Sequence, residues 1–243
     1  SIGLIGMALG AVVSGTIADR IGRKKVFTIT VLLYSIASAF CALSWNYQSL
    51  LVFRFLVGFG LGGELPVAAT LVSEYAPSRV RGRFIVLLES FWGLGWIAAA
   101  CIAYFFIPLY GWRMAFLIGA LPALYVCLIR LHMPESVRYL LAHGRVGEAR
   151  QIVVSLERQL HVPVAPFVSE KETVPVVAKA SFRELWKKPF ASRTIMLWLV
   201  WFGINFSYYG IFMWLPSLVF QQGFTVVKTF EYVLIMTLAQ LPG

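Results

Sequence analysis

The sequence has few charges, few acidic residues and little cysteine. Charged residues make up 13% of its 243 residues, and 11 acidic residues face 21 lysines and arginines. Hydrophobic residues reach 59% and the mean hydropathy is +0.78, more than the core of a soluble domain of this length requires. The three cysteines have no C-x-x-C spacing and no neighbouring histidine, which argues against disulfides and metal sites. We therefore expect a membrane protein.

Motifs for nucleotide binding and catalysis are also missing. No glycine-rich loop is followed by Gly-Lys-Ser, so ATP-driven transport is not expected. The apolar runs hold no nucleophile–base pair, metal cluster or cofactor motif, so we predict a chain that is not an enzyme and needs neither cofactor nor metal. The net charge of +10 does not indicate nucleic-acid binding, because the basic residues are confined to alternate loops.

Seven apolar runs have about the 20 residues needed to cross a hydrocarbon core of roughly 30 Å. The segment 130–193 holds eleven lysines and arginines, whereas 45–49 and 107–111 hold none. By the positive-inside rule we expect a protein of the cell membrane whose loops 18–25, 75–83 and 132–190 are cytoplasmic. The runs cover residues 1–17, 26–44, 50–73, 84–106, 112–131, 191–214 and 229–243.

The segment 132–190 separates five of these runs from the other two. Apolar residues at helical spacing, from Ala149 to Leu160, predict an amphipathic helix at the membrane surface. An extended stretch and a second short helix beginning near Ser181 are expected to follow. The chain is therefore divided into a first membrane part at 1–131, a cytoplasmic linker at 132–190 and a second membrane part at 191–243.

Small residues recur at every fourth position in two of the runs. Gly6, Gly10 and Ser14 follow this spacing, as do Gly58 and Gly62. Such spacing lets two membrane helices approach closely. We also expect Pro66, Pro122 and Pro216 to kink or end helices.

The turn between the first two runs has the pattern Gly15-x-x-x-Asp19-Arg20-x-Gly22-Arg23-Lys24. This pattern resembles the signature loop of the major facilitator superfamily of secondary transporters, where it joins the second and third membrane helices. Further stretches resemble the sugar-porter-like branch: Arg54-x-x-x-Gly58, Glu74-Tyr75-Ala76-Pro77, Arg81-Gly82-Arg83, and Pro134 to Leu140, which matches P-E-S-P-R-Y-L except at Val137.

Other stretches look more like bacterial carriers of small aromatic acids, including niacin and nicotinamide transporters. They are Gly62 to Pro66, Leu87 to Trp92 and the turn Pro108-x-x-Gly111-Trp112-Arg113. The resemblance implies an all-α multi-pass membrane fold of two six-helix halves, with the solute held between the halves. It also implies that this chain is an incomplete fold carrying helices two to eight. We expect a monomer whose partners are a small solute and the lipid bilayer.

Asp19 is the only aspartate in the chain. We expect it to accept hydrogen bonds from the start of a neighbouring helix, while basic residues of the turn pair with carboxylates such as Glu74. These contacts would latch a cytoplasmic gate. Alternatively, the basic residues only enforce topology and the glycines only permit a tight turn. The proposed gating residues are Gly15, Asp19, Arg20, Gly22, Arg23, Lys24, Glu74, Arg81 and Arg83.

Ionisable residues inside the apolar runs are few, and such residues usually face a cavity or a partner. Glu64 lies near the middle of its run and Glu89 lies near a boundary, so we expect either to couple a proton gradient to transport, together with Arg54. Arg54 and Glu64 are about 15 Å apart along a helix, too far to pair directly. The alternatives are a structural carboxyl at Glu64 and a salt bridge from Glu89 to Arg81 or Arg83.

Two helix faces carry aromatic and amide groups. Glu89, Trp92 and Trp96 share one face, and Trp201, Asn205 and Tyr208 share another. We predict that both faces hold a flat solute ring, which Asn205 or Tyr208 hydrogen-bonds; the alternative is packing against lipid or other helices.

The function expected is proton-coupled import of a small aromatic or carboxylated metabolite such as nicotinate. The alternatives are a sugar or polyol carrier and a membrane sensor that no longer transports.

Overall fold

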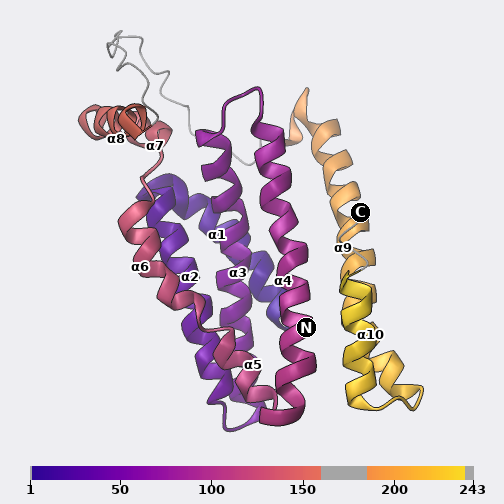
Figure 1. The fold of residues 1–243 in the computed structure, drawn as a ribbon. Helices are drawn as coiled ribbons and strands as arrows, with labels where there is room; N and C mark the ends of the chain where they lie inside the picture. Colours follow the sequence, from indigo (N-terminus) through magenta and orange to yellow (C-terminus); the bar gives the residue numbers. More distant parts are fainter. Residues whose placement is uncertain (1, 160–184, 239–243) are drawn as a thin grey trace.

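The structure is a computed structural model that describes residues 2–159 and 185–238, and every regular element in these ranges is a helix (Figure 1). This confirms the expected all-α fold. Five helices are long and apolar enough to cross a membrane: α1 (Ile2–Ile21), α2 (Arg23–Ala42), α3 (Tyr47–Tyr75), α4 (Arg81–Tyr110) and α9 (Phe190–Gln221).

The remaining two apolar runs form shorter helices. The run 112–131 is divided into α5 (Trp112–Ile118) and α6 (Pro122–His132), and the last run contains α10 (Val226–Leu238). Pro122 therefore begins a helix, whereas Pro66, Pro108 and Pro216 lie inside helices. The long helix α9 passes over Pro216 and extends beyond the predicted end of its run.

The helices α1 and α3 pack closely through their glycines. A Cβ atom at Gly10 would clash with the backbone carbonyl of Phe59, and one at Gly62 would clash with the backbone of Met7. The close approach predicted from the small residues is thus confirmed. On another side of α3 lies α2, whose buried Thr30 and Val31 face the bundle.

The linker helices α7 (Val137–Ala142) and α8 (Val146–Gln159) lie at one end of the bundle, where α8 runs across the long axis of the spanning helices (Figure 1). The predicted amphipathic helix is α8, and part of its apolar face packs on α7. Ala149 is fully buried against Tyr139 and Leu140 of α7. The predicted extended stretch and the expected helix start at Ser181 fall within residues 160–184, outside the described residues.

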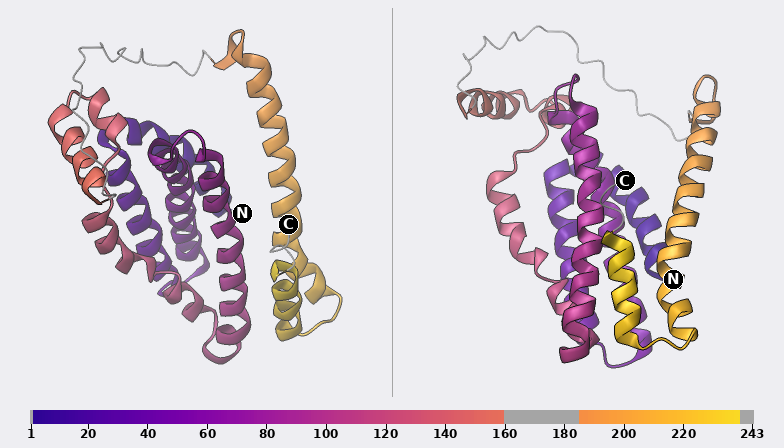
Figure 2. Two further views of the ribbon diagram at one scale, coloured as in Figure 1. Left: turned by 45° about the horizontal axis from the view of Figure 1, so that its top comes forward. Right: turned by 45° about the vertical axis from the view of Figure 1, so that its right-hand side comes forward.

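The helices α9 and α10 stand on the side of α4 (Figure 2). Contact between α10 and α4 joins this pair to the first six helices. The first and second membrane parts of the chain therefore meet mainly along α4.

Candidate functional site

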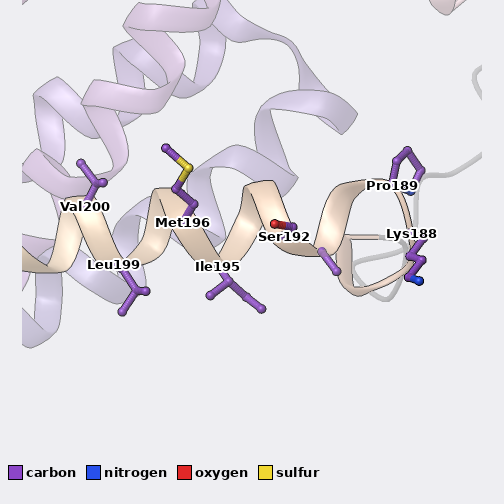
Figure 3. A pocket seen from close by; sticks show the side chains of 8 residues that line it. Lys188, Pro189, Ser192, Ile195, Met196, Leu199 and Val200 are labelled. Atoms are coloured by element: carbon purple, nitrogen blue, oxygen red, sulfur yellow. The ribbon is translucent and has the colours of Figure 1, made fainter.

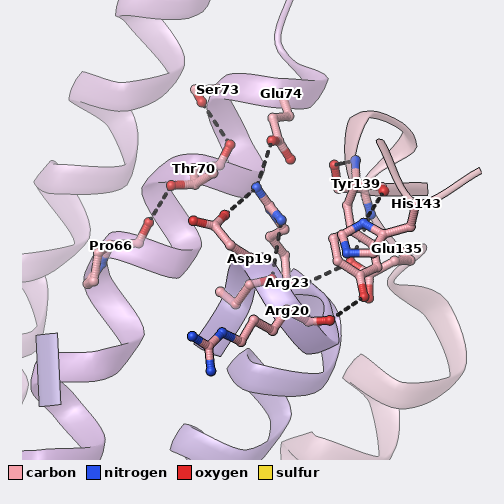
Figure 4. A network of polar contacts seen from close by, with 12 residues as sticks. Asp19, Arg20, Arg23, Pro66, Thr70, Ser73, Glu74, Glu135, Tyr139 and His143 are labelled. Carbon is pink, nitrogen blue, oxygen red and sulfur yellow. Dashed lines mark hydrogen bonds and ion pairs between the residues drawn. The ribbon is translucent and has the colours of Figure 1, made fainter. Parts of the chain in front are cut away.

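Arg23 is the centre of a polar network where α1, α2, α3 and α7 meet (Figure 4). Its Nη2 donates to Asp19 Oδ1 at 2.9 Å and lies 3.6 Å from Glu74 Oε1. Its Nη1 donates to the carbonyl oxygen of Ala18 at 3.2 Å. The side chains of Arg23 and Glu74 are only 14% and 10% exposed, whereas that of Asp19 is 73% exposed. The predicted pairing of this turn with Glu74 is therefore present, and Arg23 makes it.

Gly22 is the single residue between α1 and α2. Its φ of +106° is unfavourable for residues with a side chain, and a Cβ atom there would also clash with the carboxylate of Glu135. The turn therefore requires glycine for its backbone conformation and for the space that Glu135 occupies.

Glu135 caps the start of α2 from the linker. Its Oε1 accepts hydrogen bonds from the backbone N–H groups of Arg23 at 2.9 Å, Lys24 at 3.1 Å and Ser136 at 3.0 Å. The first N–H groups of a helix have no partner inside it, and a negative charge is favourable at that end. We had expected Asp19 to fill this role; Asp19 binds the side chain of Arg23 instead, because Glu135 already occupies the end of α2.

Two tyrosines fasten the linker to the bundle. The hydroxyl of Tyr139 donates to the carbonyl oxygen of Arg20 at 3.0 Å, and that of Tyr75 donates to the carbonyl oxygen of Glu135 at 2.7 Å. The guanidinium of Arg23 lies 5.4 Å from the centre of the Tyr139 ring. We call Asp19, Arg23, Glu74, Glu135 and Tyr139 the turn network. Glu135, Tyr139 and Tyr75 were not among the predicted site residues, although they lie in the stretches Glu74–Pro77 and Pro134–Leu140 that resemble the transporter family.

The other predicted gating residues take part through their backbone or not at all. Arg20 contributes its carbonyl group and Lys24 its N–H group. Within residues 2–159 and 185–238, the side chains of Arg20, Lys24, Arg81 and Arg83 form no ion pair. The alternative salt bridge from Glu89 to Arg81 or Arg83 is likewise not formed there. No atom lies near the space that a Cβ at Gly15 would fill.

The predicted proton-coupling residues lie apart from one another. Glu64 is half-buried on α3, near enough to Tyr34 of α2 to interact with it electrostatically. Glu89 is exposed on α4. The guanidinium of Arg54 lies 4.7 Å from the centre of the Phe116 ring of α5.

Two of the five predicted solute-binding residues meet. The rings of Trp96 on α4 and Tyr208 on α9 lie 6.2 Å apart, edge to face at 69°. Trp92 is half-buried and Trp201 is 59% exposed. The side-chain amide of Asn205 donates to the carbonyl oxygen of Trp201 at 2.8 Å, within its own helix.

A groove of about 600 Å³ lies elsewhere, along the first turns of α9 (Figure 3). Apolar side chains such as Ile195 and Leu199 line it, with Lys188 at one end. None of the predicted site residues lines this groove.

Comparisons with known proteins agree with this fold. A family model described as sugar (and other) transporter matches residues 1–239. The niacin transporter of Acinetobacter baylyi is 62% identical over 245 residues, covering 100% of this chain and 55% of that protein. The 4-hydroxybenzoate transporter of the same species is 35% identical over 226 residues, covering 92% of this chain and 50% of that protein.

Among solved structures, a D-xylose–proton symporter is similar over 98% of this chain and 54% of its own, with a TM-score of 0.62 and 18% identity. At that identity the similarity concerns the fold alone. The chain spans about half the length of the curated relatives that it matches, and these relatives are transporters rather than enzymes.

Proposed function

Because the chain belongs to the sugar (and other) transporter family of the major facilitator superfamily, we propose that the protein is a proton-coupled importer of a small aromatic or carboxylated metabolite such as nicotinate. The two relatives named above are called transporters of niacin and of 4-hydroxybenzoate. Both solutes carry a carboxyl group on an aromatic ring. The protein acts as a monomer in the lipid bilayer, without nucleic acid or cofactor.

The contact between Trp96 and Tyr208 is the observation that carries this proposal. The two rings come from helices in different membrane parts of the chain, at 6.2 Å, and their edge-to-face arrangement suits a third ring placed against them. In the proposed cycle a flat solute binds between the aromatic faces of α4 and α9, with Trp92 and Trp201 flanking it and Asn205 or Tyr208 hydrogen-bonding it.

Proton coupling is assigned to carboxylates within the spanning helices. Glu64 is half-buried near the middle of α3, where an ionised carboxylate is costly and a neutral one is not. Uptake of a proton by Glu64 or Glu89 therefore neutralises a carboxylate within the spanning helices, and this change of charge couples proton movement to solute transport. Arg54, in the first part of α3, forms no ion pair among the described residues and lies over the ring of Phe116.

The turn network is assigned to the cytoplasmic gate, with loops 18–25, 75–83 and 132–190 on that side. Its contacts join α1, α2 and α3 to the linker, so they hold that end of the bundle closed until they separate. The guanidinium of Arg23 contributes to the closed form by placing one nitrogen on the carbonyl of Ala18 and the other between Asp19 and the little-exposed carboxylate of Glu74.

The deciding experiment is uptake of radiolabelled nicotinate, beside glucose, into proteoliposomes holding the full-length protein, with and without an inward proton gradient. We expect nicotinate uptake that rises with the gradient and falls in Glu64→Gln. Glucose uptake indifferent to the gradient would instead favour a sugar carrier and leave Glu64 as a structural carboxyl. Binding of nicotinate without uptake would favour a membrane sensor.

A further inference from the structure

The fifth apolar run, residues 112–131, is broken inside its membrane-spanning stretch. Between α5 and α6 the backbone leaves the α-helical pattern: Ala120 N–H donates to Leu117, and Leu121 N–H to Ile118, three residues back in each case. The same spacing continues at Ala123, whose N–H donates to Ala120. Residues 119–121 are thus a tight 3₁₀-like joint between two short α-helices.

The sequence of the joint explains why it forms. Pro122 has no N–H, so it cannot donate to Ile118 as an α-helix would require, and its ring displaces the carbonyl in the preceding turn. Gly119 precedes it and adds flexibility. In a regular α-helix the carbonyl of Phe116 would accept the N–H of Ala120. Here Ala120 N–H donates to the carbonyl of Leu117 instead, so the carbonyl of Phe116 has no partner within its own helix.

A side chain from another helix replaces the lost bond. The hydroxyl of Ser38 on α2 donates to the carbonyl oxygen of Phe116 at 2.9 Å, across 78 residues of sequence. Ser38 is buried, at 6% exposure, within an otherwise apolar segment. An unpaired carbonyl in the hydrocarbon region is costly, and broken membrane helices persist where neighbouring helices satisfy the freed groups.

We propose that the joint at 119–121 is a hinge of the transport cycle and that Ser38 is the positioning residue that stabilises its bent form. This proposal rests on the transport function proposed above. When Ser38 releases the carbonyl, Phe116 can again accept Ala120 N–H and the joint becomes straighter, while Pro122 keeps α5 and α6 from merging into one regular helix.

Both pieces of the broken helix pack on α2, and α5 has further contacts with α3 and with the end of the α2–α3 connection. The outer piece, α5, is held by Arg54, which lies over Phe116, and by Arg113, whose Nη2 donates to the carbonyl oxygen of Ser44 at 3.2 Å. The inner piece, α6, packs on α2 through Val126 and Val31.

The inner piece also leads directly into the turn network. Only residues 133 and 134 separate the end of α6 from Glu135, whose carboxylate caps α2. A change of angle at the joint therefore moves Glu135 relative to the start of α2. In this way the hinge transmits movement between the outer piece and the gate.

The test measures the hinge angle directly in the full-length protein. Spin labels on Trp112→Cys at the start of α5 and His132→Cys at the end of α6, both exposed, in a background without other cysteines, report the distance across the joint by pulsed EPR. We expect Ser38→Ala to change the ratio of bent to straight distances by roughly 2- to 10-fold, the factor for one net hydrogen bond. The matched control is Ser35→Ala, which removes another fully buried hydroxyl one turn earlier on α2 without touching Phe116.

Gly119→Ala serves as a second variant if Ser38→Ala does not fold. Its added methyl would approach the Ser38 hydroxyl to 2.9 Å, so we expect it to disturb the same bond and to shift the distances in the same direction. An unchanged distance distribution in both variants would overturn the hinge.

Transport gives a separate reading of the same variants. We expect Ser38→Ala to change the maximal rate of nicotinate uptake by a similar factor with KM unaffected, and Ser35→Ala to leave both unaffected. If the parent protein does not take up nicotinate, the proposed function fails while the distances still decide the hinge. If nicotinate uptake is normal and the distances do not respond to Ser38→Ala, only the hinge is lost.

Discussion

Glu135 accepts the backbone N–H of Arg23 at 2.9 Å although 112 positions separate them in the sequence. The side chain that caps α2 therefore belongs to the linker, and the buried side chain of the residue it caps pairs with Glu74 of α3. Any movement that pulls the linker from the bundle uncaps α2 as it loosens the turn. The contacts of the turn network therefore share one residue, Arg23.

Removing the cap should destabilise the protein in a graded way. Glu135→Gln keeps an acceptor oxygen but loses the charge, so we expect the free energy of unfolding to fall by about 0.3–1 kcal/mol. Glu135→Ala loses both the acceptor and the charge, so we expect it to fall by about 1–2 kcal/mol. Thermal unfolding in nanodiscs, followed by tryptophan fluorescence, measures the difference. Glu148→Gln is the control, because Glu148 pairs with Arg145 on the same linker and does not contact α2. Equal melting of Glu135→Ala and the parent would contradict the capping role.

Arg23→Lys should impair the gate although the substitution keeps the positive charge. The guanidinium of Arg23 reaches Asp19, Glu74 and the carbonyl of Ala18 at once, and an ammonium cannot reproduce this geometry. We expect the initial uptake rate to fall roughly tenfold, as for loss of a hydrogen bond to a charged group, while solute affinity stays within about twofold. Lys25→Ala, at the exposed next-but-one position, should transport normally. Normal uptake by Arg23→Lys would contradict the gate assignment.

The two acids that bind Arg23 should differ in importance. Asp19 is 73% exposed, so solvent screens its pair with Arg23, whereas Glu74 is 10% exposed. We therefore expect Glu74→Gln to slow uptake several-fold more than Asp19→Asn, with both proteins present at normal levels and binding solute. Uptake rates at matched protein amounts test this order, and a larger effect of Asp19→Asn would reverse it.

The spanning helices follow from the sequence because a bilayer demands long apolar runs. The helices α1 to α4 and α9 begin within a few residues of their predicted starts. Their ends were less well predicted: α4 reaches Tyr110, beyond the predicted 106, and α9 reaches Gln221, beyond the predicted 214. Hydropathy marks the part of a helix inside the hydrocarbon region, and it gives no signal for turns that extend beyond it.

Contacts between distant segments account for what the sequence did not predict. The role of Glu135 depends on a partner 112 residues away, and that of Ser38 on one 78 residues away. Neither sequence separation is one that helix geometry brings together, so residue spacing alone does not predict these contacts. Similarly, the sequence shows that α8 has an apolar face. It does not show that this face covers α7, because that contact depends on the turn between the two helices.

The close packing of α1 on α3 should not tolerate a methyl group. In Gly62→Ala the new Cβ would press on the backbone of Met7, which cannot rotate away as a side chain can. We expect a loss of about 1–3 kcal/mol in the free energy of unfolding, typical of overpacking. Gly93→Ala on α4 is the matched control, since no atom lies within 4 Å of its Cβ position. Unfolding by denaturant in mixed micelles compares the two, and equal stability would show that α1 has room to shift.

Solute binding should depend on the ring of Trp96 more than on the hydroxyl of Tyr208. If nicotinate binds against this aromatic pair, Trp96→Ala removes one of its two walls, and we expect the Kd to rise roughly 2- to 10-fold, the range for one aromatic contact. Tyr208→Phe keeps the ring, so a smaller rise in Kd is expected, and its size measures what the hydroxyl contributes. Trp198→Ala is the control, because Trp198 also lies on α9 but pairs with Trp186 at 5.5 Å. Equilibrium binding to the full-length protein measures all three variants. Weakened binding in Trp198→Ala with none in Trp96→Ala would move the solute from the contact between α4 and α9 to the first turns of α9.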